Sequence, residues 1–421
     1  PPAVRTSMVR RDRHRRAALS EPSRSNAVPL VVVVSCLVAV VTFGSRAGFG
    51  LYLEPITSTR GFGREVFALA IGIQNIVWGI GQPLAGALAD RFGTSRVLVG
   101  GALVYAAGMV LTALATTPLA LHLSAGLLVG IGGSGASFGI VMAAASRLVP
   151  ENRRSWAMGV VTASSSLGQF LYAFLNHALI TALGWQAALS VLGGILLLVL
   201  PLATAFRGEA GTISGSAHLS LGAALKEAMG HRSYLLLVAG FFTCGYHVAF
   251  IQTHLPPYIA DAGVASWVAA AAIALVGLFN VVGSYAAGVI AGRWSKKNLL
   301  ASIYFARSAV ILAYVVFPPT ATSTLLFSAA MGLLWLSTVP PTSGLVALMF
   351  GPRWMATLFG IVFFSHQLGA LLGVWLGGFW FDRTGSYDAV WGTMIAMGIV
   401  AGFVHLPIVE RPVARLRAAP A

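Results

Sequence analysis

From Pro29 onward, the chain consists of apolar stretches that follow one another with only short polar breaks. Each stretch is long enough to cross about 30 Å of hydrocarbon as a helix. Twelve can be placed, near residues 29–54, 65–89, 96–117, 119–146, 154–181, 184–206, 232–260, 264–292, 298–318, 321–349, 355–381 and 387–409. In a bilayer the backbone of such a stretch must bond to itself, and a helix does so within one segment. We therefore predict an all-α integral membrane protein.

The composition leaves little room for a soluble domain. Of the 421 residues, 57% are hydrophobic and only 9% are charged, whereas about a quarter of the residues in a soluble domain are charged. No polar block is long enough to form a separate soluble domain. The sequence has no glycine-rich loop with the lysine of a phosphate-binding loop, and no His, Cys and carboxylate cluster with metal-ligand spacing. We expect neither an enzyme nor a bound cofactor or metal.

The basic residues lie mostly on one side of the predicted bundle. The formal charge is +15, with 27 lysines and arginines against 12 acidic residues. Only Arg60, Arg64 and Arg383 fall on the opposite side, and Arg46 and Arg307 lie within spans. By the positive-inside rule, the side rich in Lys and Arg is cytoplasmic. We therefore place both termini in the cytoplasm, in a multi-pass protein of the plasma membrane (the inner membrane of a Gram-negative cell). Its partners are membrane lipids, and the charge requires no nucleic acid.

The spans form two similar sets of six, separated by the longest polar interval. Positions in the two sets match at an offset of about 201 residues, as Gly44 with Gly245, Pro55 with Pro256 and Gly184 with Gly385. Parallel repeats with a substrate site between them near the midplane are typical of membrane transporters. We predict a monomer with a basic tail at 1–28, six-helix bundles at 29–206 and 232–409, a cytoplasmic loop at 207–231 and a second tail at 410–421.

The turn between the second and third spans carries a specific motif, GQPLAGALADRFGTSRV at residues 81–97. Its residues Gly86, Leu88, Ala89, Asp90, Arg91, Gly93 and Arg96 resemble the loop signature of the major facilitator superfamily. That resemblance implies twelve helices in two pseudo-symmetric six-helix bundles that work by alternating access. It also implies that Asp90, Arg91 and Arg96 gate the cytoplasmic side, with Asp90 near Arg353 at the start of the eleventh helix. The alternative is an ordinary charged turn after a membrane helix, and Arg153 and Arg154 in the matching loop have the same alternative.

Within that superfamily, the chain resembles the monocarboxylate transporter branch, which includes the oxalate–formate exchangers. The resemblance rests on a cation eight residues before Glu54, the pair Gly184-Trp185, and the segment Asp-Arg-Thr-Gly-Ser-Tyr-Asp at 382–388. It implies a small carboxylate as cargo and a role for the cation, Arg46, in substrate and proton binding. The chain departs from the animal members in the eighth span, where Asn280 and Ser284 replace their Asp and Arg. Any proton coupling would then fall to Arg46 and the histidines.

Arg46 lies deep in the first span, and no span has an acidic residue at mid-depth. A charge within the hydrocarbon region is costly and marks a candidate functional site. A guanidinium keeps its charge when desolvated and can bind a carboxylate through two hydrogen bonds. We expect Arg46 to be the counter-charge of an anionic substrate. The alternative is a structural arginine bonded to helix-end carbonyls of a neighbouring span.

The repeat offset carries Arg46 onto His247 in the seventh span. The two residues would then face each other across the transport pathway at matching depth. His254 lies seven residues later, on roughly the same helical face. A histidine can change its charge within the physiological pH range, so we predict His247 and His254 as proton-coupling residues. The alternative for each is a histidine satisfied by hydrogen bonds in the core.

Other polar side chains within apolar spans complete the predicted substrate site. Besides Arg46 and His247, we assign to it Tyr52, Asn280, Tyr285, His366 and Gln367. Each could instead join two helices by a hydrogen bond worth about 1 kcal/mol. Arg307 lies about one leaflet from the cytoplasmic end of its span, so we treat it as structural, with its head group reaching toward the surface.

These observations predict a secondary transporter of a small organic anion, a mono- or dicarboxylate, driven by proton symport or by exchange for a counter-anion. One alternative is efflux of amphipathic drug-like compounds through a largely uncharged aromatic cavity. A second is a membrane sensor or scaffold that transports nothing. Such a protein would not need an unpaired arginine inside the membrane.

Overall fold

The structure is a computed structural model that describes residues 27–149, 154–207, 221–351 and 354–417. Those residues contain 12 helices long and apolar enough to cross a membrane, as predicted. The first half comprises α2 (Ala27–Ala47), η1 (Phe49–Tyr52), α3 (Leu53–Arg60), α4 (Arg64–Phe92), α5 (Thr94–Leu114), α6 (Pro118–Leu121), η2 (His122–Leu128), α7 (Val129–Gly135), α8 (Phe138–Leu148), α9 (Arg154–Leu183), α10 (Trp185–Leu196), α11 (Val199–Leu202) and η4 (Ala203–Phe206). The second half comprises α12 (Leu221–Met229), α13 (Arg232–Asp261), α14 (Ser266–Arg293), α15 (Lys296–Val315), α16 (Ala321–Leu334), α17 (Val339–Phe350), α18 (Met355–Thr384), α19 (Asp388–His405) and α20 (Ala414–Arg417).

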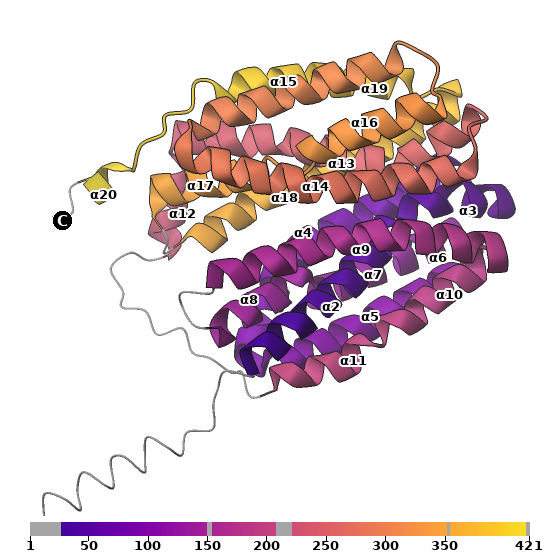
Figure 1. The fold of residues 1–421 in the computed structure, drawn as a ribbon, viewed down its shortest axis with the longest axis horizontal. Helices are drawn as coiled ribbons and strands as arrows, with labels where there is room; N and C mark the ends of the chain where they lie inside the picture. The colour runs from indigo at the N-terminus through magenta and orange to yellow at the C-terminus, as the bar shows by residue number, and fades with distance from the viewer. Residues whose placement is uncertain (1–26, 150–153, 208–220, 352–353, 418–421) are drawn as a thin grey trace, which may run out of the picture.

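The two halves form two bundles that lie side by side, the first from indigo to magenta and the second from salmon to yellow in Figure 1. They meet along three lines of contact, where α4 packs along α18, α9 packs along α14, and η1 and α3 pack against α13. Glycines let the helices approach closely along these lines. A side chain at Gly79 would meet Gln367, and one at Gly277 would meet Gln169. Such close packing by small residues is the usual way in which membrane helices associate.

The fourth and tenth spans are both interrupted at the same place in the repeat. The fourth span stops at the end of α7 and resumes with α8, so that Ala136 and Ser137 lie between two helices. The tenth span stops at the end of α16 and resumes with α17. The offset of 201 residues carries Ala136 onto Ser337 and Ser137 onto Thr338, both within the second interruption. The repeat found in the sequence is therefore also a repeat of helix breaks.

The first span differs from the single helix expected at 29–54. It breaks at Gly48, directly after the turn that carries Arg46, and continues as η1 and α3 to Arg60. The break lets the backbone approach the second half, since a side chain at Gly50 would collide with the carbonyl oxygens of Gln252 and Thr253. Arg46 consequently sits in the last turn of α2, where the two halves meet.

Arg307 and Asn280 hold the break in the tenth span. Arg307 is fully buried and donates from Nε and Nη2 to the Leu334 carbonyl, at 3.1 and 2.6 Å, and from Nη2 to the Trp335 carbonyl. Asn280 accepts from the Leu336 N–H at 3.0 Å and donates to Ser166 Oγ of the first half at 3.0 Å. The expectation that the Arg307 head group reaches the surface is therefore wrong, because the carbonyls at the end of α16 provide it with buried acceptors.

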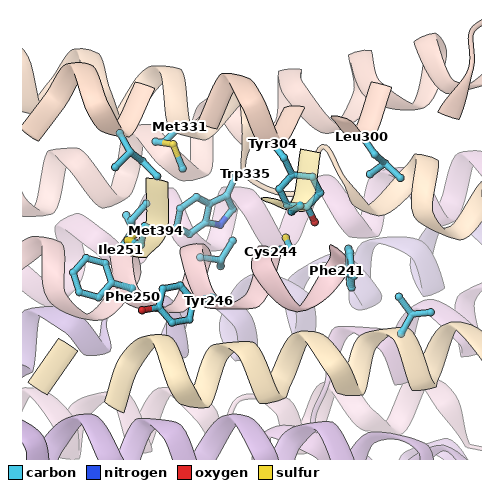
Figure 2. Close-up of a cluster of buried hydrophobic side chains, with 14 of the residues drawn as sticks. Phe241, Cys244, Tyr246, Phe250, Ile251, Leu300, Tyr304, Met331, Trp335 and Met394 are labelled. Carbon is cyan, nitrogen blue, oxygen red and sulfur yellow. The ribbon is translucent and has the colours of Figure 1, made fainter. Parts of the chain in front are cut away.

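The core of the second half is aromatic and fixes the orientation of α13. Figure 2 shows Tyr246, Phe250 and Ile251 of α13 beside Met331, Trp335 and Met394. The Phe250 ring lies 4.9 Å from the Trp391 ring of α19, edge to face. Tyr246 Oη lies 2.7 Å from Oγ1 of Thr393, which is also on α19. These contacts decide which side of α13 faces the first half.

The interval at 207–231, expected as a loop, contains the short helix α12, which packs against α13. Ala224 and Ala228, four residues apart, form its buried side. The tails at 1–26 and 418–421 lie outside the described residues, as does 208–220 within the interval. The boundaries of the tails and of the central loop therefore stay predictions.

Candidate functional site

A cavity lies between the two halves at the level of Arg46. Its free volume is about 40 Å³, which holds about three water-sized molecules. The first half contributes Arg46, Phe49, Gly50, Ile71, Gln74, Asn75 and Trp78, and the second contributes Val248, Ala249, Gln252, Thr253, His366, Gln367 and Ala370. Arg46 is the only side chain among these that carries a permanent charge. The cavity is therefore a small chamber with both polar and apolar walls and one fixed positive charge.

The partners of Arg46 are neutral. Its Nε donates to Gln74 Oε1 at 3.2 Å, its Nη2 donates to Asn75 Oδ1, and its guanidinium lies 4.3 Å from the centre of the Trp78 ring. Each amide is held in this orientation by its own N–H, since Gln74 Nε2 donates to the Ala125 carbonyl and Asn75 Nδ2 donates to the Ile71 carbonyl, both at 3.0 Å. Among the described residues, no carboxylate forms an ion pair with Arg46.

The opposite wall of the cavity is formed by α18. His366 stacks on the Phe363 ring, with ring centres 5.6 Å apart, and its Nδ1 lies 3.1 Å from Gln367 Oε1. The Gln367 side chain is fully buried, and its Nε2 has no hydrogen-bond partner. Leaving a buried donor unpaired costs about 1–3 kcal/mol. The cavity thus contains an unneutralised cation, and one residue of its wall has a buried hydrogen-bond donor without a partner.

A second cavity, of about 20 Å³, adjoins Arg46 within the first half. It shares Arg46, Gln74 and Trp78 with the cavity between the halves. The rest of its lining is Thr42, Phe43, Tyr105, Val129, Gly130, Gly133, Ala136 and Ser137, which is mostly apolar. The two cavities therefore adjoin each other at these three side chains, and the Arg46 side chain borders both.

His247 does not lie opposite Arg46, which corrects the sequence-based expectation. The ring is fully buried within the second half, and its Nε2 donates to the Met394 carbonyl of α19 at 2.8 Å. The α13 residues that line the cavity instead are Val248, Ala249, Gln252 and Thr253. The repeat matched Arg46 and His247 along the sequence, but α13 is rotated so that its aromatic side and His247 face α19.

Three other predicted substrate residues lie outside both cavities. Tyr52 is buried in the first half, where its hydroxyl donates to Asn176 Oδ1 at 2.6 Å. Asn280 bonds to Ser166 and to the broken tenth span. Tyr285 is 75% exposed on α14. The structure thus brings together Arg46, His366 and Gln367 of the predicted set, and joins Gln74 and Asn75 to them.

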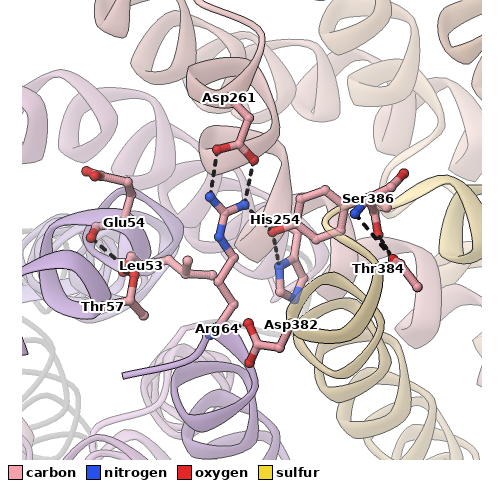
Figure 3. Close-up of polar contacts among 10 residues, drawn as sticks. Leu53, Glu54, Thr57, Arg64, His254, Asp261, Asp382, Thr384 and Ser386 are labelled. Carbon is pink, nitrogen blue, oxygen red and sulfur yellow. Dashed lines mark hydrogen bonds and ion pairs between the residues drawn. The ribbon is translucent and has the colours of Figure 1, made fainter. Parts of the chain in front are cut away.

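The halves are joined at the Arg64 end of the bundle by a cluster of charges that the sequence analysis did not identify. Arg64 pairs with Asp261 through two bonds of 2.6 and 2.7 Å and stacks 3.7 Å from the centre of the Phe381 ring. The Asp382 carboxylate accepts from the backbone N–H groups of Arg64 and Glu65, at 2.9 and 2.8 Å. Figure 3 shows Arg64 between Asp261 and Asp382. Asp382 thus caps the first turn of α4 from the other half.

Two further side chains, those of Glu65 and His254, extend this cluster. Glu65 accepts from Arg383 at 3.1 Å and from the Trp375 indole at 3.0 Å. Beneath Arg64, His254 is fully buried; its Nε2 donates to the Val374 carbonyl at 2.8 Å and its Nδ1 lies 3.2 Å from the Tyr387 hydroxyl, which also accepts from Arg64. His254 therefore lies below the cluster of charges at the Arg64 end and outside the cavity at Arg46. One feature of the sequence points to this cluster, because Arg64 and Arg383 lie on the side of the bundle that has few basic residues.

The predicted gating residues Asp90, Arg91 and Arg96 are exposed at the opposite end, where α4 turns into α5. Arg96 Nη1 lies 3.5 Å from the Phe92 carbonyl. Arg353, the expected neighbour of Asp90, lies outside the described residues, as does Arg153. Between Arg64 and Trp78, α4 packs against α18, and Trp78 forms an edge-to-face pair with Phe363. Nearer to Asp90, the α4 side chains Leu84 and Leu88 are exposed. The gating role stays a prediction.

Comparison with known proteins places the chain among membrane transporters. Residues 35–374 match the family model of the Major Facilitator Superfamily. An uncharacterized MFS-type transporter of Bacillus subtilis, YcxA, is 24% identical over 398 residues, which cover 91% of this chain and 96% of that protein. Monocarboxylate transporter 11 of Mus musculus is 27% identical over 358 residues, covering 81% and 77% of the two chains.

The fold also matches a solved structure. A bacterial homolog of the human lysosomal transporter Spinster, in an inward-facing and occupied conformation, superposes with a TM-score of 0.72. The superposition covers 92% of this chain and 97% of that one, at 14% sequence identity. At that identity the likeness concerns the fold alone, and it agrees with the two bundles of six spans.

Proposed function

The chain belongs to the major facilitator superfamily, and we propose that it is a secondary active transporter that carries a small organic anion across the plasma membrane by alternating access. The cargo is a carboxylate, and its counter-charge is Arg46. The single observation that carries this proposal is a permanent cation in an interface cavity whose partners are all neutral.

The energetics favour a mobile anion over a structural role for Arg46. A buried cation is costly unless it is paired and hydrogen-bonded. Gln74 and Asn75 orient the guanidinium but leave its charge uncompensated. An anion in the cavity would supply that compensation and would also lie beside Gln367, which lines the same cavity. Arg46 belongs to the first half and Gln367 to the second, so such an anion would touch both halves.

Alternating access needs an interface that can open at either end. The Arg64 cluster closes one end through ion pairs and hydrogen bonds, which can be broken and remade without disturbing a hydrophobic core. The breaks in the fourth and tenth spans give each half a point at which the helix end can move. By the charge bias of the sequence, we place the Arg64 end outside the cell and Asp90 on the cytoplasmic side.

The relatives support the chemical class of the cargo. Several of them are named as monocarboxylate transporters, and this chain has a cation deep in its first span. Drive by a proton gradient and drive by exchange for a second anion both fit this site. His254, below the closure at the Arg64 end, is the proton site that we propose for the first case, since it bonds to a hydroxyl that also binds Arg64.

A thermal-shift screen of the purified protein tests the proposal. A ligand that binds only the folded state raises its apparent stability. Formate, acetate, propionate, oxalate and a set of amphipathic cations would be screened against the wild type, Arg46→Ala, and the control Arg60→Ala, which removes an arginine bonded only within the first half. We expect a carboxylate to stabilise the wild type and the control but not Arg46→Ala. Stabilisation of all three proteins by amphipathic cations alone would favour drug efflux and contradict the proposal.

A further inference from the structure

The glycines of the fourth span are not all required by helix packing. A side chain at Gly130 would lie 2.8 Å from Val77, one at Gly132 would collide with the Tyr105 backbone, and one at Gly135 would lie 2.9 Å from Gly101. Such contacts are too short for a real side chain, so those three positions must stay glycine for α7 to pack on α4 and α5. Gly133 differs, because a Cβ built there meets no atom within 4 Å.

Packing therefore does not explain the glycine at 133, and helix stability disfavours it. Glycine in the middle of a helix costs about 0.5–1 kcal/mol relative to alanine. The open space beside Gly133 is not featureless, since Gly133 lines the 20 Å³ cavity that adjoins Arg46. Phe43, Val129 and Ala136 form the apolar lining of the same cavity. An alanine or valine at 133 would project into the space that these residues enclose.

The position of this cavity suggests what it holds. Arg46, Gln74 and Trp78 line both this cavity and the cavity between the halves. When the carboxylate of an organic anion contacts the guanidinium, the hydrocarbon tail begins at the next carbon atom. This apolar cavity is a favourable place for that tail. A volume of about 20 Å³ admits a group close to the size of a water or a methyl. This cavity thus fits the terminal methyl of a tail of about one or two carbons.

We propose that Gly133 keeps open a compartment for the hydrocarbon tail of the anion bound at Arg46, so that the side chain at position 133 sets the longest tail that the transporter accepts. This inference rests on the proposed function, and it adds a residue that selects cargo by size without touching the charged group. A larger residue at position 133 would exclude the carboxylates with the longest tails first.

The test compares Gly133→Ala and Gly133→Val with the wild type, using formate, acetate, propionate and butyrate as ligands. Dissociation constants would be measured by titration of the purified protein. Gly100→Ala and Gly100→Val are matched controls, because Gly100 is also a helical glycine of the first half with open space at its Cβ, but it lines neither cavity. Unfolding midpoints without ligand would establish that all four variants fold.

We expect Gly133→Val to weaken propionate binding at least tenfold while formate binding changes less than twofold. Gly133→Ala should give an intermediate loss, and both Gly100 variants should match the wild type. An equal loss for formate and propionate, or no loss for either, would overturn the role of Gly133. Failure of the underlying proposal has a different signature, because carboxylates would then bind Arg46→Ala as well as they bind the wild type.

Discussion

Arg64, at the start of α4 in the first half, forms a two-bond ion pair with Asp261, at the end of α13 in the second half, with N–O distances of 2.6 and 2.7 Å. Asp382 caps the same turn of α4 through the backbone. A side chain at Gly63 would collide with the Asp382 carboxylate, so glycine makes room for this cap. The two halves are thus fastened at one end by polar contacts, which suits the closure that the proposed alternating access would open in each cycle.

The first prediction concerns this closure. Arg64→Ala removes the ion pair, whose partly exposed geometry makes it worth up to about 1 kcal/mol, and should raise the population open at this end about fivefold. The measurement is the labelling rate of Val374→Cys, a buried site on α18, by a charged thiol reagent applied from the Arg64 side. The background carries Cys36→Ser and Cys244→Ser. Arg60→Ala is the control, and faster labelling there too would argue against a specific closure.

The second prediction concerns the hydroxyl between Arg64 and His254. Burial raises the pKa of the Tyr387 hydroxyl above its ordinary value, although the Arg64 charge opposes the shift. The hydroxyl stays protonated and can donate to His254 while it accepts from Arg64. Tyr387→Phe keeps the ring but removes both bonds, so we expect a loss of about 1–2 kcal/mol in the free energy of unfolding. Tyr285→Phe, at an exposed position, should cost nothing measurable, and equal effects would count against the chain of bonds.

The third prediction concerns the break in the tenth span. Arg307→Met keeps most of the side-chain volume but leaves the Leu334 and Trp335 carbonyls without their buried donor. We expect a loss of about 2–4 kcal/mol of stability, measured by denaturant unfolding in detergent. Arg293→Met, at an exposed position at the end of α14, provides the control. If Arg307→Met lost no more than about 0.5 kcal/mol, the effect of an ordinary surface change, Arg307 would not brace the break.

The fourth prediction is a pH dependence outside the membrane spans. Burial would raise the pKa of Glu410, but bonds from the Lys297 backbone N–H and the Ser295 hydroxyl, both 2.7 Å, and the Lys296 charge lower it overall. A carboxyl whose pKa is lower in the folded state stabilises the fold above its unfolded pKa, about 4.3. That contribution disappears as the pH falls through the folded-state pKa.

Glu410→Gln should therefore lower the unfolding midpoint at neutral pH and converge with the wild type as the pH falls below about 4. Thermal unfolding in detergent from about pH 3 to about pH 7, a range that brackets an ordinary carboxyl pKa, checks this. Glu54→Gln, at an exposed position on α3, is the control. A wild-type advantage that is constant across the whole range would show that Glu410 acts without its charge.

The sequence predicts the spans closely because each is apolar and each break carries charges or turn residues. It also singles out Arg46, which lines the cavity between the halves, since a lone cation in an apolar span is visible without any structure. The rotation of each helix is less accessible. α13 is apolar on nearly all sides, so nothing in its pattern indicates that Val248, Ala249 and Gln252, rather than His247, line the cavity.

Long-range partners are the second class of information that the sequence lacks. Arg64 and Asp261 are 197 residues apart, and each on its own looks like an ordinary charge at a helix end. Asn280 and Leu336 are likewise distant in sequence, yet the Asn280 side chain accepts a hydrogen bond from the Leu336 backbone N–H where the tenth span breaks. Such pairs follow from the packing of distant helices, within one half or between the two, and cannot be predicted from periodicity.

The most direct test of the central claim is exchange of a labelled carboxylate in proteoliposomes that contain the wild type, Arg46→Lys or Arg46→Gln. Arg46 is the one fixed charge in the cavity between the halves, so transport should depend on a cation at that position. We expect exchange in the wild type, reduced exchange in Arg46→Lys, which keeps the charge but loses the two-bond geometry, and none above background in Arg46→Gln. Undiminished exchange in Arg46→Gln would contradict the account.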